Sequence, residues 1–175
     1  MRRIIAIAAI ILIPTATLYA AELKVGHFEL QRLIAQSDAG KESREKYMAR
    51  AKNYQEELNS RTEKLKKLKE DIESESKKLK GNKKLPAQLV EKNKGYASQF
   101  RESQRLQEAY KDELKVYDAE LTRKVLEEFS AVLGVFATSN KYDYIFRLTD
   151  SFAFAGEKHD LTDELVKAFN KAHRK

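Results

Sequence analysis

The chain has 175 residues and no cysteine, and its 34 lysines and arginines against 27 aspartates and glutamates give a formal net charge of +7. The lack of cysteine excludes disulfides and a lipid attached to an N-terminal cysteine. The length allows one ordinary domain.

Residues 1–20 have the layout of a secretory signal peptide. Two arginines precede an unbroken apolar run over residues 4–13, which is too short to span a bilayer. Small residues at Ala20 and Ala21 supply the candidate cleavage points. We therefore expect an exported mature chain with a net charge of +5, which is +7 minus the two arginines. The alternative is an uncleaved N-terminal membrane anchor.

The mature chain opens with a predicted strand and a short helix. Residues 23–30 alternate weakly between apolar and polar side chains, which is typical of a strand. The following Leu33 and Ile34 indicate a short helix. Either Ser37 or Asp38 is placed to cap the long helix that comes next.

Two long charged stretches, over about residues 41–80 and 86–128, predict a helical hairpin arm. The first contains no glycine or proline, and it carries an apolar or aromatic seam at heptad spacing that favours a coiled coil. At 1.5 Å per residue its helix would be roughly 60 Å long. A glycine followed by a proline places the tip of the hairpin near residues 81–86. The seam residues are Tyr47, Ala51, Tyr54, Leu58, Arg61, Leu65, Leu68, Ile72, Glu75 and Leu79.

The returning stretch has a less regular seam. Its heptad residues are Leu89, Tyr96, Phe100, Tyr110, Leu114, Tyr117 and Leu121. Leu106, Val116 and Val125 lie off that register, so apolar groups surround more of this helix than one partner would cover. The surplus could line a surface for an unfolded, apolar client. The candidate client-facing residues are Tyr96, Phe100, Leu106, Tyr110, Val116 and Tyr117.

After Phe129 the pattern returns to that of a small domain. Residues 131–137 continue the helix, and residues 141–148 alternate as a strand. A turn and a second short strand over residues 151–155 are predicted next. Asp160 or Thr162 then caps a last amphipathic helix.

The two ends of the chain together predict a discontinuous body over residues 21–40 and 129–175, separate from the arm over residues 41–128. Its roughly 60 folded residues are marginal on surface-to-volume grounds. We therefore expect several copies of the body to share one core.

A cluster of lysines surrounds the predicted tip. It predicts a site for anionic head groups, to which each lysine near such a surface contributes about 1 kcal/mol. The alternative is a solvated charge run without a ligand. The lysines are Lys77, Lys78, Lys80, Lys83, Lys84, Lys92 and Lys94, and Glu91 is the one acidic residue among them.

The sequence offers no convincing catalytic or metal-binding constellation. Its histidines, His27, His159 and His173, have no metal-ligand spacing. Nucleophile-elbow and phosphate-binding loop motifs are absent. We therefore predict a protein that is not an enzyme and needs no cofactor or metal.

The order of these elements resembles the Skp/OmpH family of periplasmic chaperones for outer-membrane proteins. The features that carry the resemblance are the exported N-terminus, the charged hairpin with its basic tip, and the segments LKVGHFELQRLIAQSDAGK, YDYIFRLTDSFAFAG and DLTDELVKAFN. With it, the predicted fold class is α+β: a small antiparallel β body that trimerises, with a long protruding antiparallel α-helical coiled-coil hairpin.

The resemblance implies a homotrimer whose bodies form a β-barrel-like hub, with three arms around a cavity. It also implies an ATP-independent holdase, located in the periplasm, that keeps unfolded outer-membrane proteins soluble. By residue match, the hub would use Leu23, Val25, Phe28, Tyr144, Phe146, Phe152 and Phe154.

Two other functions fit the same features. One is a structural envelope or adaptor-type protein whose hairpin docks against a fixed partner. The other is a peripheral binder of anionic lipid or lipopolysaccharide through the basic tip. Nucleic acid is not an expected partner, because an exported chain seldom meets it.

Overall fold

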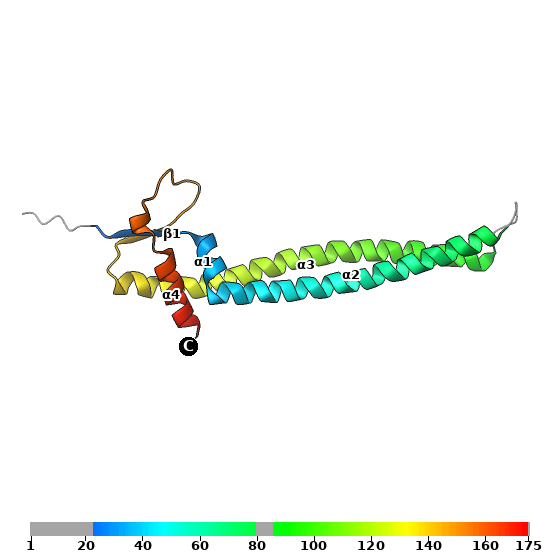
Figure 1. The fold of residues 1–175 in the computed structure, drawn as a ribbon, viewed down its shortest axis with the longest axis horizontal. Helices are drawn as coiled ribbons and strands as arrows, with labels where there is room; N and C mark the ends of the chain where they lie inside the picture. The colour runs from blue at the N-terminus through cyan, green and yellow to red at the C-terminus, as the bar shows by residue number, and fades with distance from the viewer. Residues whose placement is uncertain (1–22, 80–85, 175) are drawn as a thin grey trace, which may run out of the picture.

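The computed structural model describes residues 23–79 and 86–174, which form a small body and one long arm (Figure 1). The predicted signal peptide and most of the predicted tip lie outside the described residues. Within those residues no helix is both long and apolar enough to cross a membrane. The elements, in chain order, are β1 (Val25–Phe28), α1 (Leu30–Gln36), α2 (Asp38–Lys78), α3 (Ala87–Ser139), β2 (Tyr144–Arg147), the 3-10 helix η1 (Glu157–His159) and α4 (Thr162–His173).

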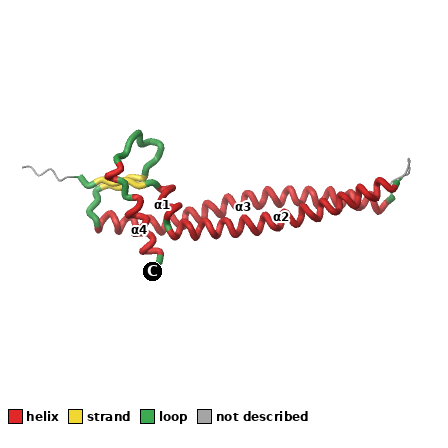
Figure 2. Tube along the Cα trace, in the orientation of Figure 1, coloured by secondary structure: helices red, strands yellow, loops and turns green. Residues whose placement is uncertain are grey.

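The arm consists of α2 and the greater part of α3, which lie side by side in Figure 2. Their contacts show that the two helices run antiparallel. Arg61 of α2 contacts Glu102 of α3 at 3.5 Å, and further along α2 Asp71 contacts Lys92, which lies earlier in α3, at 2.7 Å. The 41 residues of α2 make the arm roughly 60 Å long.

A tight corner joins α1 to α2. Ser37 ends α1 and caps α2, because its Oγ accepts a hydrogen bond from the Gly40 backbone N–H at 3.2 Å. This confirms one of the two predicted caps. A Cβ built on Gly40 would lie 1.8 Å from the carbonyl oxygen of Ile34, so the corner has no room for a larger residue.

The burial pattern of α2 confirms its predicted seam. Between residues 44 and 79, the ten predicted seam positions are half-buried or buried and every other residue is exposed. Only Ile72 among them is fully buried. The seam therefore has heptad geometry but remains open to water along most of its length.

The predicted seam of α3 is wrong in part. Heptad spacing placed Leu106 and Val125 off register, but Leu106 is half-buried and Val125 is buried. Phe100, which was placed in the seam, is 43% exposed. The helix is 53 residues long and continues from the arm into the body, where it packs against α4. Because its partner changes along its length, one heptad register cannot describe its inward face.

The body contains a two-stranded parallel sheet, in which Val25 of β1 lies opposite Tyr144 of β2. The prediction of an antiparallel sheet is therefore wrong. The whole arm connects β1 to β2, and such a long crossover is what a parallel pair requires. The predicted strand over residues 151–155 is also wrong, because these residues form a turn and an irregular loop.

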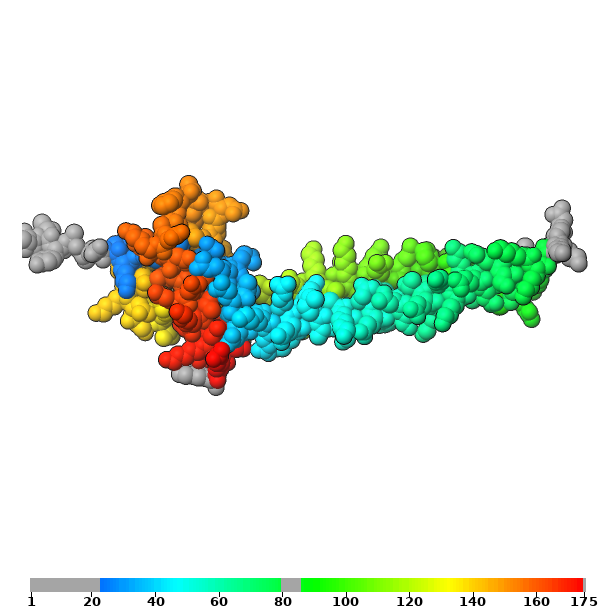
Figure 3. All heavy atoms as spheres, in the orientation of Figure 1, coloured from blue at the N-terminus to red at the C-terminus, as the bar shows by residue number. Residues whose placement is uncertain are grey.

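A single hydrophobic core joins the body to the base of the arm. The ring of Phe129 in α3 lies 5.3 Å from that of Phe28 in β1 and 5.7 Å from that of Phe169 in α4, both in edge-to-face geometry. Figure 3 shows segments from both ends of the chain gathered at one end of the arm. The other buried core residues are Leu33, Ala39, Val125, Leu161 and Leu165.

Candidate functional site: the aromatic face of the body and the seam of the arm

β2 and the loop that follows it expose a group of aromatic side chains. Tyr144 and Phe146 of β2 stack with ring centroids 6.0 Å apart, and Phe152 in the following loop lies 6.1 Å from Phe146. Their exposed fractions are 55%, 44% and 44%, and that of Phe154 is 86%. A patch of this kind on a small body marks an interaction surface. We call these four residues the aromatic face.

The structure divides the seven predicted hub residues into two groups. The four residues of the aromatic face are exposed, as is Leu23 at 60%, and Val25 lies half-buried beside Tyr144. Phe28, by contrast, is 5% exposed within the body's own core. Its side chain thus packs within a single copy of the body.

His27 fastens the loop that carries Phe152 and Phe154. Its Nε2 lies 3.1 Å from the carbonyl oxygen of Gly156, and its own carbonyl accepts a hydrogen bond from the Leu161 N–H at 2.8 Å. A carbonyl can only accept, so Nε2 carries the proton. Its Nδ1 is buried and has no hydrogen-bond partner among the described residues. The role of His27 in this chain is thus to hold the loop.

A charged network joins α1 to the start of α4. The Arg32 guanidinium donates to the Asp160 carboxylate at 2.7 Å, and the Thr162 hydroxyl and N–H both donate to the same carboxyl group. Burial opposes ionisation of this carboxyl group. The hydrogen bonds from Thr162 and Arg32 outweigh that effect and hold the pKa of Asp160 below its ordinary value.

Aromatic rings and polar groups both line the seam in the middle of the arm. Tyr54 and Tyr110 stack face to face with ring centroids 3.9 Å apart. Each hydroxyl donates to a carboxylate, Tyr54 to Glu113 at 2.6 Å and Tyr110 to Glu57 at 2.5 Å. The hydrogen bond to Glu57 raises the pKa of Tyr110 to about 12.

Further polar contacts follow along the seam on both sides of this tyrosine pair. Their side chains are half-buried or exposed, and an ion pair that water can reach contributes at most about 1 kcal/mol. The two helices are therefore held by many weak contacts rather than by a dry core. The contacts are Arg50 over the Tyr117 ring at 3.6 Å, Arg61 to Glu102 at 3.5 Å, and Lys92 to Asp71 and Glu75 at 2.7 and 2.5 Å.

The candidate client-facing residues of α3 lie in two different environments. Tyr110 and Tyr117 take part in the seam contacts just described, and Leu106 is half-buried. Phe100 and Val116 are exposed, at 43% and 59%. Tyr96, half-buried, stacks on Phe100 with ring centroids 6.1 Å apart.

Two further apolar residues of the arm are exposed, and the heptad pattern did not single them out. Met48 is 57% exposed and Val90 is 38% exposed. Each directly follows a seam residue, Tyr47 and Leu89 respectively. An apolar residue next to a seam position was the signal in the sequence that would have identified them.

The lysines near the tip also differ from one another. Lys77, Lys78 and Lys94 are exposed and have no ion pair among the described residues. Lys92 lies between two acidic residues of α2, and its charge is locally compensated. Lys80, Lys83 and Lys84 lie outside the described residues.

The three histidines belong to three different elements. His27 lies in β1 and His159 in η1, whereas His173 of α4 lies between Glu42 and Glu128, 3.2 Å from each. His173 therefore ties α4 to both helices of the arm. No group of histidine and acidic side chains in the described part of the chain is arranged to hold a metal ion.

Comparison with known proteins adds to this geometry. The sequence matches the profile of the family described as outer membrane protein (OmpH-like) over residues 24–169. The chain belongs to the OmpH-like family. This confirms the resemblance drawn from the order of its elements.

The fold is similar to that of a solved OmpH-like structure, a candidate outer membrane chaperone from Caulobacter crescentus CB15 determined at 2.83 Å resolution. The TM-score is 0.75, the identity is 15%, and the alignment covers 86% of each chain. At this identity the likeness concerns the fold alone. A search of curated proteins found no match to this OmpH-like chain.

Proposed function

We propose that this OmpH-like protein is an ATP-independent periplasmic holdase. It would bind unfolded outer-membrane proteins in a cavity between helical arms and prevent their aggregation. The observation that carries the proposal is the free arm, which projects from the body in Figure 1 and is held by a polar, half-open seam. Exposed apolar residues such as Phe100 and Val116 along such an arm offer weak contacts without sequence preference.

The aromatic face supports assembly of several copies through the body. An isolated two-stranded sheet is marginal, and β2 has a pairing partner on one edge alone. A neighbouring copy could cover the exposed aromatic face and pair with the free edge of β2, which would stabilise the two-stranded sheet. The proposed number of three copies rests on the family resemblance.

The charge of the chain agrees with this role. A mature net charge of +5, from +7 minus the two arginines of the predicted signal peptide, would attract acidic clients over a Debye length. The periplasmic location depends on that signal peptide, which lies outside the described residues.

The first test is native mass spectrometry of the mature protein, alone and after dilution of a urea-unfolded outer-membrane β-barrel protein into it. We expect a trimer that gains one or more unfolded chains. A monomer or dimer that ignores the client would contradict the proposal. A docking protein with one fixed envelope partner would then be the better interpretation.

A shortened arm tests where the client binds. Replacing residues 51–114 by a short glycine-containing loop removes the distal part of both helices and leaves the body and its aromatic face unchanged. We expect the trimer to persist and the suppression of client aggregation, followed by light scattering, to be lost. An armless trimer that still suppressed aggregation would rule out the cavity between the arms.

A second candidate function is contact with anionic lipid at the tip. It is supported by Lys77, Lys78 and Lys94, which are exposed and have no acidic partner in the described chain. Changing these three lysines to glutamine should weaken co-sedimentation with phosphatidylglycerol vesicles and reduce its dependence on salt. Unchanged binding would make the cluster a solvated charge run.

A further inference from the structure

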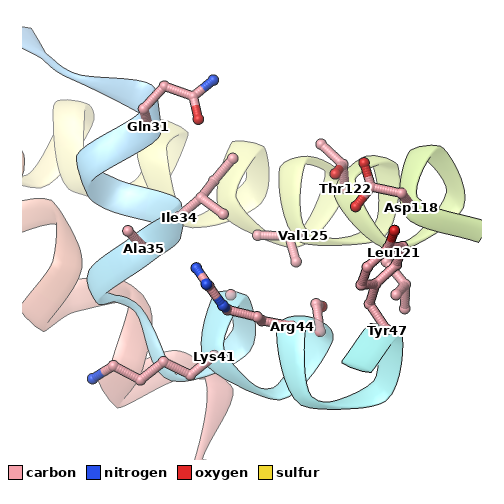
Figure 4. A pocket seen from close by; sticks show the side chains of 12 residues that line it. Gln31, Ile34, Ala35, Lys41, Arg44, Tyr47, Asp118, Leu121, Thr122 and Val125 are labelled. Carbon is pink, nitrogen blue, oxygen red and sulfur yellow. The ribbon is translucent and has the colours of Figure 1, made fainter. Parts of the chain in front are cut away.

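A hollow of about 410 Å³ lies at the base of the arm, where α1, α2 and α3 meet (Figure 4). Its floor is apolar, because Leu121 and Val125 of α3 are buried and Ile34 of α1 is half-buried. The α1–α2 corner borders one end, since Ala35 and Gly40 also line the hollow. The hollow therefore has an apolar floor, a polar rim and a helix corner at one end.

Arg44 of α2 points into this hollow, toward Ala35 of α1 (Figure 4). It is exposed and forms no ion pair or hydrogen bond with any described residue. Arg61 and Arg123, by contrast, each contact a carboxylate of their own chain. A guanidinium group is well suited to bidentate contact with a carboxylate, so Arg44 presents an unused binding group above an apolar floor.

The other charges of the rim narrow the choice of ligand. Lys41 adds a second positive charge to the lining, and Asp118 places one negative charge on the α3 side. The rim thus carries a net positive charge of one, counted over these three residues. A net charge of plus one is balanced by a singly charged carboxylate and exceeded by a doubly charged phosphate.

We propose that the hollow binds the apolar chain end of an unfolded polypeptide, with the terminal carboxylate on Arg44 and the last side chain on the floor formed by Leu121 and Val125. A chain end suits a hollow that a helix corner borders at one end, because the chain need not continue past the corner. This inference rests on the proposed holdase function and names one recognition element within it. An acidic side chain next to an apolar residue has the same chemistry, and the experiment separates the two sources.

The test uses the full mature protein and short fluorescein-labelled peptides, with binding followed by fluorescence anisotropy. The first peptide ends in leucine with a free carboxylate, the second is its C-terminal amide, and the third ends in glycine. We expect both changed peptides to bind about tenfold more weakly or worse, because one loses the charge-assisted hydrogen bonds and the other the apolar contact. A fourth, amidated peptide carries an internal glutamate–leucine pair.

Two variants make the Arg44 guanidinium unavailable to the peptide in different ways. Arg44→Gln removes the guanidinium, and Ala35→Glu supplies a carboxylate from α1 that would compete for it. Both positions are exposed, so both variants should fold. Each should weaken binding of the leucine peptide about tenfold or more. The matched control is Arg105→Gln, which removes an equal charge from an exposed site on α3 outside the hollow and should leave binding unchanged.

The outcomes are distinct. The proposed site would be wrong if all four peptides bound equally well. It would also be wrong if Arg44→Gln and Arg105→Gln lowered the peptide affinity equally. Binding of the internal glutamate–leucine peptide as tight as that of the chain end would overturn the assignment to a chain end. Aggregation of an unfolded client is measured on the same samples. Intact holdase activity without peptide binding would refute this inference alone, and peptide binding without holdase activity would refute the proposed function alone.

Discussion

The body and the arm are stabilised in different ways, although α3 runs through both. In the body, Phe28, Phe129 and Phe169 pack edge to face and are 5%, 3% and 1% exposed. In the arm between residues 44 and 120, only Ile72 and Leu89 among the described residues are buried. A dry core resists deformation, whereas a wet seam of weak contacts opens locally at low cost. The comparison suggests a rigid body that carries an adaptable arm.

The most damaging change should lie in the body. Phe129→Ala removes the central ring of the core and should lower the free energy of unfolding by about 3–5 kcal/mol. Tyr110→Ala, in the arm part of the same helix, should cost clearly less, because the ring it removes is half-buried. Urea unfolding followed by circular dichroism measures both. Equal losses would mean that the arm and the body share one cooperative core.

Alanine substitution of one glycine in each region should change stability by smaller amounts and in opposite directions. Gly40→Ala places a Cβ against the Ile34 carbonyl oxygen in the corner and should destabilise the protein by about 1–3 kcal/mol. Gly95→Ala in the arm meets no atom within 4 Å and should stabilise α3 by up to about 1 kcal/mol. Thermal unfolding of the two variants should therefore shift in opposite directions. A neutral Gly40→Ala would show that the corner can widen.

What the sequence allowed us to predict follows the same division. The seam of α2 and the Ser37 cap were predictable because both depend on neighbours within a few residues. The pairing of β1 with β2 was not, because the partners Val25 and Tyr144 are separated by the whole arm. Residues 151–155 alternate like a strand, but in the structure their aromatic side chains belong to an exposed face.

The candidate sites divide in a similar way. Exposed aromatic residues of the body were identifiable from their type, whereas the burial of Phe28 depends on α3 and α4 packing against β1. The hollow around Arg44 was not predictable, since α3, which is far from α1 and α2 in the sequence, completes it. The roles of the hub, tip and client-facing residues remain predictions.

The stability of the body at acid pH tests the contribution of the Asp160 carboxylate. The pKa of Asp160 lies below its ordinary value, so its contribution to stability is present above the ordinary carboxyl value near 4 and is lost as the pH falls through the folded pKa. Asp160→Asn should therefore be less stable than the unchanged protein by about 1–2 kcal/mol above pH ~4, with the gap closing at lower pH. The measurement is the urea midpoint from pH 2 to pH 7. A gap independent of pH would show that the carboxylate charge does not matter.

Alkaline pH tests the hydrogen bond between Tyr110 and Glu57 in the arm, for which we expect the smallest effect on stability. Tyr110 donates to Glu57, and this bond raises the pKa of Tyr110 to about 12. Because the folded pKa is raised, the contribution of the bond is complete below the ordinary tyrosine value near 10 and is lost as the pH rises through about 12. An ionised Tyr110 would face the Glu57 carboxylate without a proton to share. The seam should therefore loosen at this level while the buried phenylalanine core stays closed.

Absorbance at 295 nm against pH follows the ionisation directly. Glu57→Gln should move one tyrosine from about 12 toward the ordinary value, because the charged acceptor is gone. Glu108→Gln, an equal change of charge at an exposed site of α3, should leave the titration as it is. If Glu57→Gln changed nothing, the stacked tyrosines would already be open in solution. The contrast between a closed body and a loosely held arm would then be greater than the structure indicates.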